Sequence, residues 1–532
     1  MSRGRAPAAR CGRLAGVNSA TELVQRTEQR RQSVSRALDG KHRRRFGQYF
    51  TPAPVANFLA SLLSIPTEGS CRLLDPGAGV GSLAAAVVAE AIQQRSAAHI
   101  QITAFELDEQ LVPHLAETLR DCQETGLDAN IKVDISLRHA DFIDWASSSL
   151  AGSLLVDAET FTACVMNPPY RKINTNGADR LALERIGVQV TNLYTAFLAL
   201  GAALLDPGGQ LSAIVPRSFA NGPYFKPFRQ FFLARMALDR LHVYEKRGLV
   251  FADTEVLQEN VVFKATRDRS SDTVVLSTSA GFDDVPSARG VRYASVVHPD
   301  DPHQFVHIPV SESDAYVATQ MTGLPATLRD LKVQVSTGRV VDFRSREHLR
   351  QEPAEDAVPL IYPGHLQDAR ILWPLADSKK PNALANCNET VALLLPNETY
   401  AVVKRFSAKE EVKRVVAALS SPEEIPGPSV AFENHLNVFH RSGHGLPRRL
   451  ALGLVAFLNS SAVDTYIRQF SGHTQINATD LRGLRYPSVT QLEMLGRSLT
   501  GRPWPSQLEL DELIATHVPA LNVQQFAVPA AA

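Results

Sequence analysis

The sequence predicts an α/β fold with a mostly parallel sheet in the first half of the chain and a mixed α+β domain in the second. Three observations support this prediction. Short apolar runs alternate with helical patterns from residue 46 to about residue 266. A glycine-rich turn directly follows the first apolar run. After residue 267 the alternation stops, and short apolar runs are separated by loops rich in Pro, Asn and His.

Five apolar runs of strand length predict strands at residues 71–74, 102–105, 131–137, 162–166 and 210–215. Apolar residues at helical spacing predict helices at 82–95, 109–122, 191–205 and 225–236. Strands that alternate with helices of this length indicate crossover units, so we expect helices on both faces of the sheet. The β-rich stretch 249–264 has no helical pattern and predicts a closing hairpin.

The chain is expected to have three parts. Residues 1–40 form a basic, flexible arm that ends in an amphipathic helix near 21–38, and residues 1–45 carry eleven Arg and one Lys against three acids. A catalytic domain spans 41–268 and ends at the Ser- and Asp-rich stretch 267–272. The remaining residues, 269–532, form a loop-rich domain with helices at 409–420 and 447–470. The arm is either a phosphate-binding element or a solvated tail.

The bulk composition excludes several classes of protein. Of the 532 residues, 44% are hydrophobic and 21% are charged, as in globular proteins, and no run approaches the ~20 apolar residues of a membrane span. The five cysteines are scattered and form no C-x-x-C pair, which argues against disulfides and structural zinc and favours the cytoplasm. The histidine spacing fits no zinc motif, so no metal site is expected.

The turn from Asp75 to Gly81 predicts a cofactor site. Its glycines allow the backbone to turn sharply and to approach a ligand closely. Glu106 follows the second predicted strand, where a carboxylate can accept hydrogen bonds from ribose hydroxyls. Asp75 would repel a pyrophosphate but could bind an ammonium group, so we expect a cofactor without phosphates. Asp141 and Phe142 follow the third predicted strand and could bind an adenine ring, although an Asp-Phe pair taken alone is more often a helix cap than a ligand.

The tetrapeptide Asn167-Pro168-Pro169-Tyr170 is the strongest catalytic signal. It follows a predicted strand that ends in the crevice where open α/β sheets bind ligands. The Asn167 side-chain oxygen and the Pro168 carbonyl could accept hydrogen bonds from an aromatic amine and stabilise the positive charge that develops during attack. Tyr170 offers a flat face on which a base could stack.

In this order the motifs resemble those of the N6-adenine DNA methyltransferases of the gamma arrangement. The resemblance implies a Rossmann-like methyltransferase domain that binds S-adenosylmethionine, with no metal, and a base flipped out of the duplex. It also implies that the segment from Phe46 to Pro52 lines the methionine end of the cofactor. Phe251 is the candidate for a second stacking aromatic, with Tyr224 or Phe225 as alternatives. The cofactor-binding residues implied by the match are Tyr49, Thr51, Pro52, Asp75, Gly77, Gly79, Glu106, Asp141 and Phe142.

The second half resembles the target-recognition domain of the PstI/BsuBI group of modification methylases. The resemblance lies in the segments 335–343, 362–365, 433–437 and 471–477. It implies double-stranded DNA as partner, a short site such as CTGCAG methylated at its adenine, and a separately encoded endonuclease within a restriction-modification system. The side chains that could bind phosphates or base edges are Arg339, Arg344, Lys404, Arg405, Asn434, Asn437, His473, Gln475 and Asn477.

Three alternatives stay open. Methylation of cytosine N4 uses similar chemistry, but the resembling enzymes more often have Ser in place of Asn167. Methylation of a glutamine side chain in a protein would explain the catalytic half alone, because about 260 further residues follow Thr266. A DNA-binding subunit that has lost catalysis is disfavoured by the intact acids and tetrapeptide.

Overall fold

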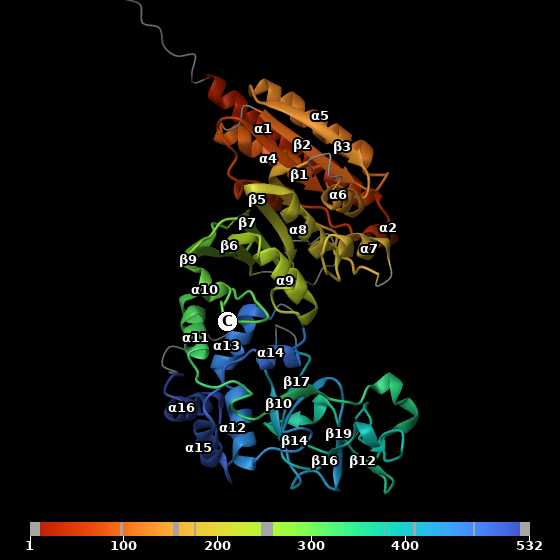
Figure 1. Cartoon of the computed structure of the whole chain (residues 1–532), viewed down its shortest axis with the longest axis vertical. Helices are drawn as coiled ribbons and strands as arrows, with labels where there is room; N and C mark the ends of the chain where they lie inside the picture. Colours follow the sequence, from red (N-terminus) through yellow and green to blue (C-terminus); the bar gives the residue numbers. More distant parts are fainter. Residues whose placement is uncertain are drawn as a thin grey trace, which may run out of the picture. The chain divides into compact units, whose positions relative to one another are not determined.

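The computed structural model describes residues 11–95, 99–152, 159–174, 177–245, 259–282, 284–376, 378–407, 411–471 and 474–521. The chain divides into two compact units (Figure 1). The first consists of Met1–Ala220 and Tyr224–Pro299, and the second of Asn221–Pro223 and Asp300–Ala532. The first unit therefore extends beyond the expected boundary at residue 268, because two further strands continue its sheet.

A nine-stranded sheet forms the centre of the first unit, in the order β3-β2-β1-β4-β5-β7-β6-β8-β9. Neighbours from β3 to β5 are parallel, and β7 lies antiparallel between β5 and β6. The predicted α/β class with a mostly parallel sheet is confirmed. The strands are β1 (Ser70–Pro76), β2 (His99–Glu106), β3 (Lys132–His139), β4 (Phe161–Met166), β5 (Leu205–Pro216), β6 (Met236–Tyr244), β7 (Asn260–Arg267), β8 (Thr273–Ser279) and β9 (Ser287–Arg292).

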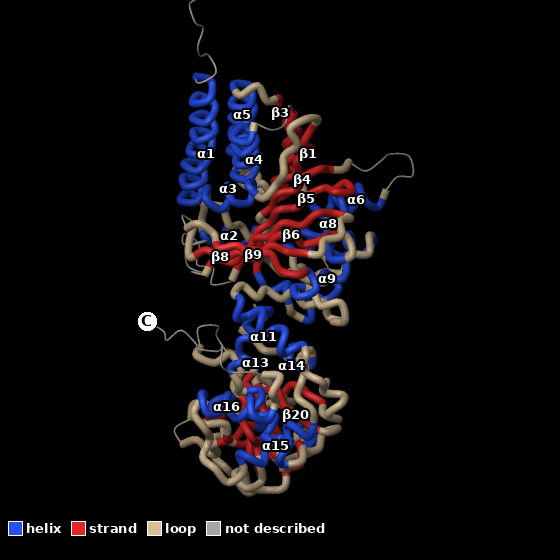
Figure 2. The backbone as a smooth tube through the Cα atoms, turned by 90° about the vertical axis from the view of Figure 1, so that its left-hand side faces the viewer, coloured by secondary structure: helices blue, strands red, loops and turns tan. Residues whose placement is uncertain are grey.

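Helices cover both faces of this sheet. Figure 2 shows α1, α4 and α5 on one face, with α6 and α8 on the other. The predicted closing hairpin is the antiparallel pair β6–β7, so its first strand lies earlier than expected, and residues 246–258 lie outside the described part. The helices are α1 (Cys11–Ala37), α2 (Gly40–Phe46), α3 (Ala53–Ser61), α4 (Ser82–Gln94), α5 (Val112–Asp128), α6 (Phe142–Ala151), α7 (Ala178–Arg185), α8 (Leu193–Leu204), α9 (Lys226–Leu233) and α10 (Tyr293–Val296).

The basic N-terminal region is not a flexible arm over its described residues. Helix α1 packs against α4 and α5, with Ala20 and Leu23 fully buried in the core. Arg30 pairs with Glu117 at 3.1 Å and Asp121 at 3.0 Å on α5. Burial of apolar side chains and these ion pairs hold the helix to the domain, so some of its positive charge is neutralised within the chain.

The second unit contains two small sheets and a layer of helices. The six-stranded sheet has the order β10-β20-β17-β18-β14-β13, and the five-stranded sheet has the order β11-β15-β12-β19-β16. The predicted α+β character is confirmed. The strands are β10 (Gln334–Thr337), β11 (Leu349–Arg350), β12 (Ala357–Ile361), β13 (Leu366–Gln367), β14 (Arg370–Ile371), β15 (Ala383–Ala385), β16 (Leu395–Pro396), β17 (Tyr400–Lys404), β18 (Ala417–Ser420), β19 (Ser429–Phe432) and β20 (Leu436–His440).

Helices α12, α13 and α15 contribute buried side chains to the largest core cluster of this unit. Of these, α12 and α13 confirm the predicted helical stretch 447–470. The predicted helix at 409–420 is wrong, because residues 417–420 pair with β17 as strand β18. Here pairing with a neighbouring strand outweighed the local apolar spacing. The helices are α11 (Glu312–Thr322), α12 (Arg448–Leu458), α13 (Ser461–Phe470), α14 (Ala478–Arg482), α15 (Val489–Leu499) and α16 (Gln507–His517).

No single helix among the described residues has both the length and the apolar character needed to cross a membrane. The bent pair α12–α13 meets the length and composition test only jointly, and its apolar side chains are buried in the core of the second unit.

Candidate active site

A cavity of about 310 Å³ lies in the first unit at the carboxyl ends of the parallel strands. Its walls come from the residues that follow β1 to β4, from the segment before α3 and from α8. Open α/β sheets bind ligands at this edge. The lining residues are Phe46, Gly47, Gln48, Tyr49, Phe50, Gly77, Gly79, Phe105, Glu106, Leu107, Leu111, Ala140, Asp141, Phe142, Ile143, Asn167, Pro169, Arg171, Asp179, Leu193 and Phe197.

The glycine turn after β1 is held by Glu106. Gly79 has a φ of 60°, a conformation that favours glycine, and its N–H donates to Glu106 Oε2 at 2.8 Å. The other oxygen of Glu106 accepts from the N–H of Asp108 at 2.8 Å. Burial raises the pKa of Glu106, and these two N–H groups partly offset the rise. Glu106 thus joins the turn to the end of β2 while its side chain lines the cavity.

Asp75 is placed differently from the expectation. It is fully buried within β1 and does not line the cavity. The strand continues through Pro76, so Asp75 is still part of the sheet and lies one residue before the turn. Burial raises the pKa of Asp75 to about 7; the N–H of Ala84, in the first turn of α4, opposes this rise, and Glu106 adds to it. Asp75 therefore lies within the strand beside the turn and outside the cavity lining.

Asp141 both caps a helix and lines the cavity. Its Oδ1 accepts from the N–H groups of Ile143 at 2.7 Å and Asp144 at 3.2 Å, at the start of α6. Phe142 is buried, and its ring centroid lies 5.4 Å from that of Phe105 and 5.0 Å from that of Phe197. The cap fixes the position of the carboxylate, and the aromatic rings form an apolar wall beside it.

The amide of Asn167 has a defined orientation. Its Nδ2 donates to the Tyr49 carbonyl at 2.7 Å and to the Thr51 hydroxyl at 3.0 Å. Both amide hydrogens are therefore used, and only Oδ1 remains as an acceptor. The Tyr170 hydroxyl lies 3.0 Å from this Oδ1 and 3.1 Å from the Ile214 carbonyl oxygen, and its one proton can serve either. Burial raises the pKa of Tyr170 well above its usual value, so this hydroxyl stays protonated.

The segment 46–50 forms one wall of the cavity and is attached to Asp108. Asp108 Oδ2 accepts from Gln48 Nε2 at 2.7 Å and lies 2.7 Å from His42 Nε2. Burial raises the pKa of Asp108, but the contacts with Gln48 and His42 lower it by more. The pKa of Asp108 is therefore below its usual value. An ionised Asp108 thus connects the wall to the end of β2, two residues beyond Glu106.

The structure brings eight of the thirteen expected cofactor and catalytic residues to the cavity lining: Tyr49, Gly77, Gly79, Glu106, Asp141, Phe142, Asn167 and Pro169. Five lie outside the lining: Thr51, Pro52, Asp75, Pro168 and Tyr170. Phe251 lies outside the described residues. Of the alternatives to it, Tyr224 is 76% exposed, whereas Phe225 is buried against Tyr194.

Sequence reasoning missed several residues at or beside the cavity, among them Asp108, Arg171, Asp179 and Phe197. Asp108 carried a signal, because it stands two residues after Glu106 at the end of the same strand. Arg171 directly follows the catalytic tetrapeptide. Phe197 had no local signal, because it belongs to a continuous apolar helix and reaches the cavity only through the packing of α8.

In the second unit, five expected DNA-binding residues gather in one place: Arg405, Asn434, Asn437, Gln475 and Asn477. Arg405 donates to the Asn434 carbonyl at 3.1 Å, to Gln475 Oε1 at 3.3 Å and to Asn477 Oδ1 at 3.5 Å. Asn437 is fully buried and donates to the Ile476 carbonyl at 2.8 Å, so it joins two segments and does not face solvent.

The remaining candidates in this unit make other contacts or cannot be placed. Lys404 pairs with Glu411 at 3.3 Å. Arg339 donates to two main-chain carbonyls, those of Ala392 and Leu394. Arg344 lies over the ring of the exposed Phe343. His473 lies outside the described residues. Among the residues described, no three His, Cys, Asp or Glu side chains form a group that could hold a metal ion.

Known proteins resemble this chain along nearly its whole length. Residues 83–251 match the family described as Eco57I restriction-modification methylase. The type II methyltransferase M.BsuBI of Bacillus subtilis is 40% identical over 482 residues, which cover 90% of this chain and 94% of that protein. The type II methyltransferase M.PstI of Providencia stuartii is 38% identical over 488 residues, covering 91% and 95%.

The fold also resembles that of a solved enzyme. The structure of the type IIL restriction-modification enzyme MmeI in complex with DNA aligns with a TM-score of 0.52 at 11% identity, covering 90% of this chain and 73% of that one. This likeness concerns the fold, whereas the family follows from the sequence identities. The resemblance predicted from the motifs is confirmed, and the chain belongs to the type II methyltransferases of restriction-modification systems.

Proposed function

We propose that this enzyme transfers a methyl group from S-adenosylmethionine to the N6 amino group of adenine in a short duplex DNA sequence. The observation that carries the proposal is the amide of Asn167. Both of its hydrogens are bound by Tyr49 and Thr51, so its oxygen, which the Tyr170 hydroxyl contacts here, is held as a fixed acceptor beside the cavity.

The residues of the cavity fit this cofactor. Glu106 and Asp141 offer carboxylate oxygens for ribose hydroxyls and an adenine amine, and the rings of Phe105 and Phe142 offer apolar surface for the base. When bound, S-adenosylmethionine supplies an electrophilic methyl group. The capping contacts of Asp141 and the Gly79 contact of Glu106 hold both carboxylates in place before any ligand arrives.

The tetrapeptide would activate an amine as follows. The lone pair of an aromatic amine is delocalised into the ring, so the amine is a weak nucleophile. Asn167 Oδ1 and the Pro168 carbonyl would accept its two N–H bonds and stabilise the positive charge that develops on nitrogen. The Tyr170 hydroxyl, which lies at Asn167 Oδ1 here, would then donate to the Ile214 carbonyl instead. Each acceptor would contribute about 1.5–3 kcal/mol, or roughly 10- to 150-fold in rate.

The second unit would supply recognition of the sequence. Its cluster of Arg, Asn and Gln side chains offers the donors and acceptors that bind base edges. The similarity to M.PstI and M.BsuBI supports a short palindromic site, for which CTGCAG is our candidate, and a separately encoded endonuclease against which methylation protects.

Methyl transfer from labelled cofactor to duplex DNA, followed by nucleoside analysis, tests the proposal. We expect label in N6-methyladenine with the wild type and loss of label with Asn167→Ala. Asn388→Ala, which removes an exposed amide in the second unit, serves as the matched control and should retain activity.

The same experiment separates the alternatives. Label in cytosine would assign the enzyme to N4 methylation. Transfer to a protein glutamine but to no duplex would contradict the DNA assignment. Cofactor binding without transfer to any substrate would support a non-catalytic DNA-binding subunit.

A further inference from the structure

Three segments of the second unit meet at one end of the six-stranded sheet. They are residues 405–407 after β17, residues 433–435 before β20 and residues 474–477. Main-chain hydrogen bonds join them: Arg405 N–H donates to the His435 carbonyl at 2.8 Å, and Ile476 N–H donates to the Arg405 carbonyl at 2.7 Å. We call these three segments the polar cluster.

The polar cluster contains a buried carboxylate that binds a histidine. The Glu433 side chain is fully buried, and both of its oxygens contact His435. Oε1 lies 2.5 Å from Nδ1 of the ring, and Oε2 accepts from the His435 main-chain N–H at 2.9 Å. Burial of a carboxylate costs free energy, and this cost is offset only by such charge-assisted contacts. Burial accordingly raises the pKa of Glu433, and the contacts with His435 oppose the rise.

These contacts determine which atom of His435 can bind a ligand. Because Nδ1 faces an acceptor, Nδ1 carries a proton and the second ring nitrogen, Nε2, is left for another partner. The His435 side chain is 43% exposed, in contrast to the completely buried Glu433. The Phe406 ring packs against the imidazole, with 4.6 Å between the ring centroids. The ring is therefore restrained from two sides, while part of it faces solvent.

The neighbours of His435 are polar, and each of three of them has one buried side-chain atom without a hydrogen-bond partner in the described part of the chain. Asn434 Oδ1, Asn437 Oδ1 and Arg405 Nε are buried and have no hydrogen-bond partner among the described residues. The charged groups near Glu433 and His435 are Arg405, Lys404 with its partner Glu411, and Asp342. The negative charge of Asp342 adds to the rise in the pKa of Glu433. Buried polar atoms without partners are costly unless a ligand or water satisfies them.

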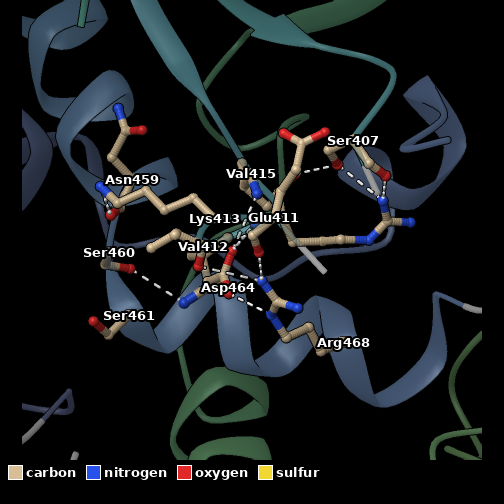
Figure 3. A network of polar contacts seen from close by, with 12 residues as sticks. Ser407, Glu411, Val412, Lys413, Val415, Asn459, Ser460, Ser461, Asp464 and Arg468 are labelled. Atoms are coloured by element: carbon tan, nitrogen blue, oxygen red, sulfur yellow. Dashed lines mark hydrogen bonds and ion pairs between the residues drawn. The ribbon is translucent and has the colours of Figure 1, made fainter. Parts of the chain in front are cut away.

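A second network of polar contacts includes Ser407, at the end of the 405–407 segment (Figure 3). Asp464 on α13 accepts from the main-chain N–H of Arg414 and, at 3.1 Å, from that of Val415, and it pairs with Arg468 at 2.6 Å. The buried Arg414 guanidinium donates to Ser407 and, at 2.9 Å, to the Ser471 hydroxyl. Ser407 directly follows Phe406, so this network connects the 405–407 segment to α13 and to Ser471 at its end.

We propose that His435 reads a base edge of the target DNA through Nε2, and that the buried Glu433 is a positioning residue that orients its ring. The inference rests on the proposed function, since it names the recognition contact of the same enzyme. Arg405, Asn434 and Gln475 beside it have the donors and acceptors that base edges bind, which favours contact with bases over an apolar partner.

A library of duplexes that contains every six-base-pair sequence tests this inference. Wild type, His435→Ala, Glu433→Gln and the control His444→Ala are each given cofactor, and the methylated sequences are identified. His444 is a matched control because it is a 69% exposed histidine of the same unit. We expect wild type and His444→Ala to methylate one common set. His435→Ala should also accept sequences that differ at one base pair, with discrimination there reduced about tenfold. Glu433→Gln should relax the same base pair.

Other outcomes overturn the inference. If His435→Ala slows methylation of all sequences equally, or makes binding less salt-dependent, then His435 contacts a phosphate or only supports the fold. If Glu433→Gln unfolds at a lower temperature, the His435→Ala variant alone tests whether His435 contacts a base, because the His435 side chain is partly exposed. If wild type methylates no sequence in the library, the proposed function itself fails. This outcome differs from failure of the inference about His435, which would show only in the variants.

Discussion

Asn167 donates a hydrogen bond from its side-chain Nδ2 to the hydroxyl of Thr51 at 3.0 Å, across 116 positions of sequence. The same nitrogen donates to the Tyr49 carbonyl at 2.7 Å. The segment before α3 therefore does more than form a wall of the cavity. It determines which end of the Asn167 amide is presented as an acceptor.

Thr51→Val should lower kcat about fivefold and leave the KM for the cofactor nearly unchanged. The substitution keeps the shape of the side chain but removes one acceptor of the Asn167 amide, which is worth about 1 kcal/mol. Steady-state kinetics with a duplex substrate would measure both constants. Thr273→Val, at an exposed position on β8, is the control. A change in KM without a change in kcat would contradict the positioning role.

Two substitutions at Tyr170 should distinguish the role of its ring from the role of its hydroxyl. Tyr170→Phe removes the group that lies at Asn167 Oδ1 but keeps a stacking surface, so we expect activity within about threefold of wild type. Tyr170→Ala removes the surface on which a flipped base would stack, which is worth about 1–3 kcal/mol, and should lower kcat/KM by roughly 5- to 150-fold. Equal losses in both variants would show that the hydroxyl, not the ring, is required.

Asp108→Asn should weaken binding of S-adenosylmethionine about tenfold with a smaller effect on kcat. The substitution removes the charged acceptor that connects Gln48 and His42 to the end of β2, a contact worth about 1.5 kcal/mol, so the wall 46–50 would be held less firmly. Titration calorimetry with the cofactor measures the change. Asp128→Asn, at the exposed end of α5, is the matched control. Unchanged affinity in Asp108→Asn would show that this contact serves only the fold.

The buried Asp75 predicts a pH dependence of stability. Burial raises the pKa of Asp75 in the folded protein to about 7, so the folded state favours the protonated carboxyl. The stability that this provides is fully present below the usual Asp pKa and is lost as the pH rises to about 7. Relative to wild type, Asp75→Asn should therefore gain stability between pH 4.5 and 7.5, on the order of 3 kcal/mol. Urea unfolding of both proteins at the two pH values measures this difference. A constant difference across the range would mean that Asp75 titrates normally.

The strands and helices of the first unit were largely predictable because their sequences have strong local patterns. The runs at 71–74 and 162–166 became β1 and β4, and the glycine turn and the tetrapeptide lie directly after them. Parallel strands end at one edge, so motifs that follow different strands had to lie close together. Prediction failed where a partner decided the conformation, as at residues 417–420, which became a strand by pairing with β17.

By itself the sequence determined the fold class, the family and eight of the residues that line the cavity at the strand ends, since each depends on short-range patterns. Only the tertiary structure decided that Asp75 is buried outside the cavity lining, that Thr51 orients Asn167, and that Glu433 binds His435 inside a cluster of three distant segments. The physical reason is that hydrogen bonds and burial depend on distances between residues far apart in the chain. No local pattern records those distances.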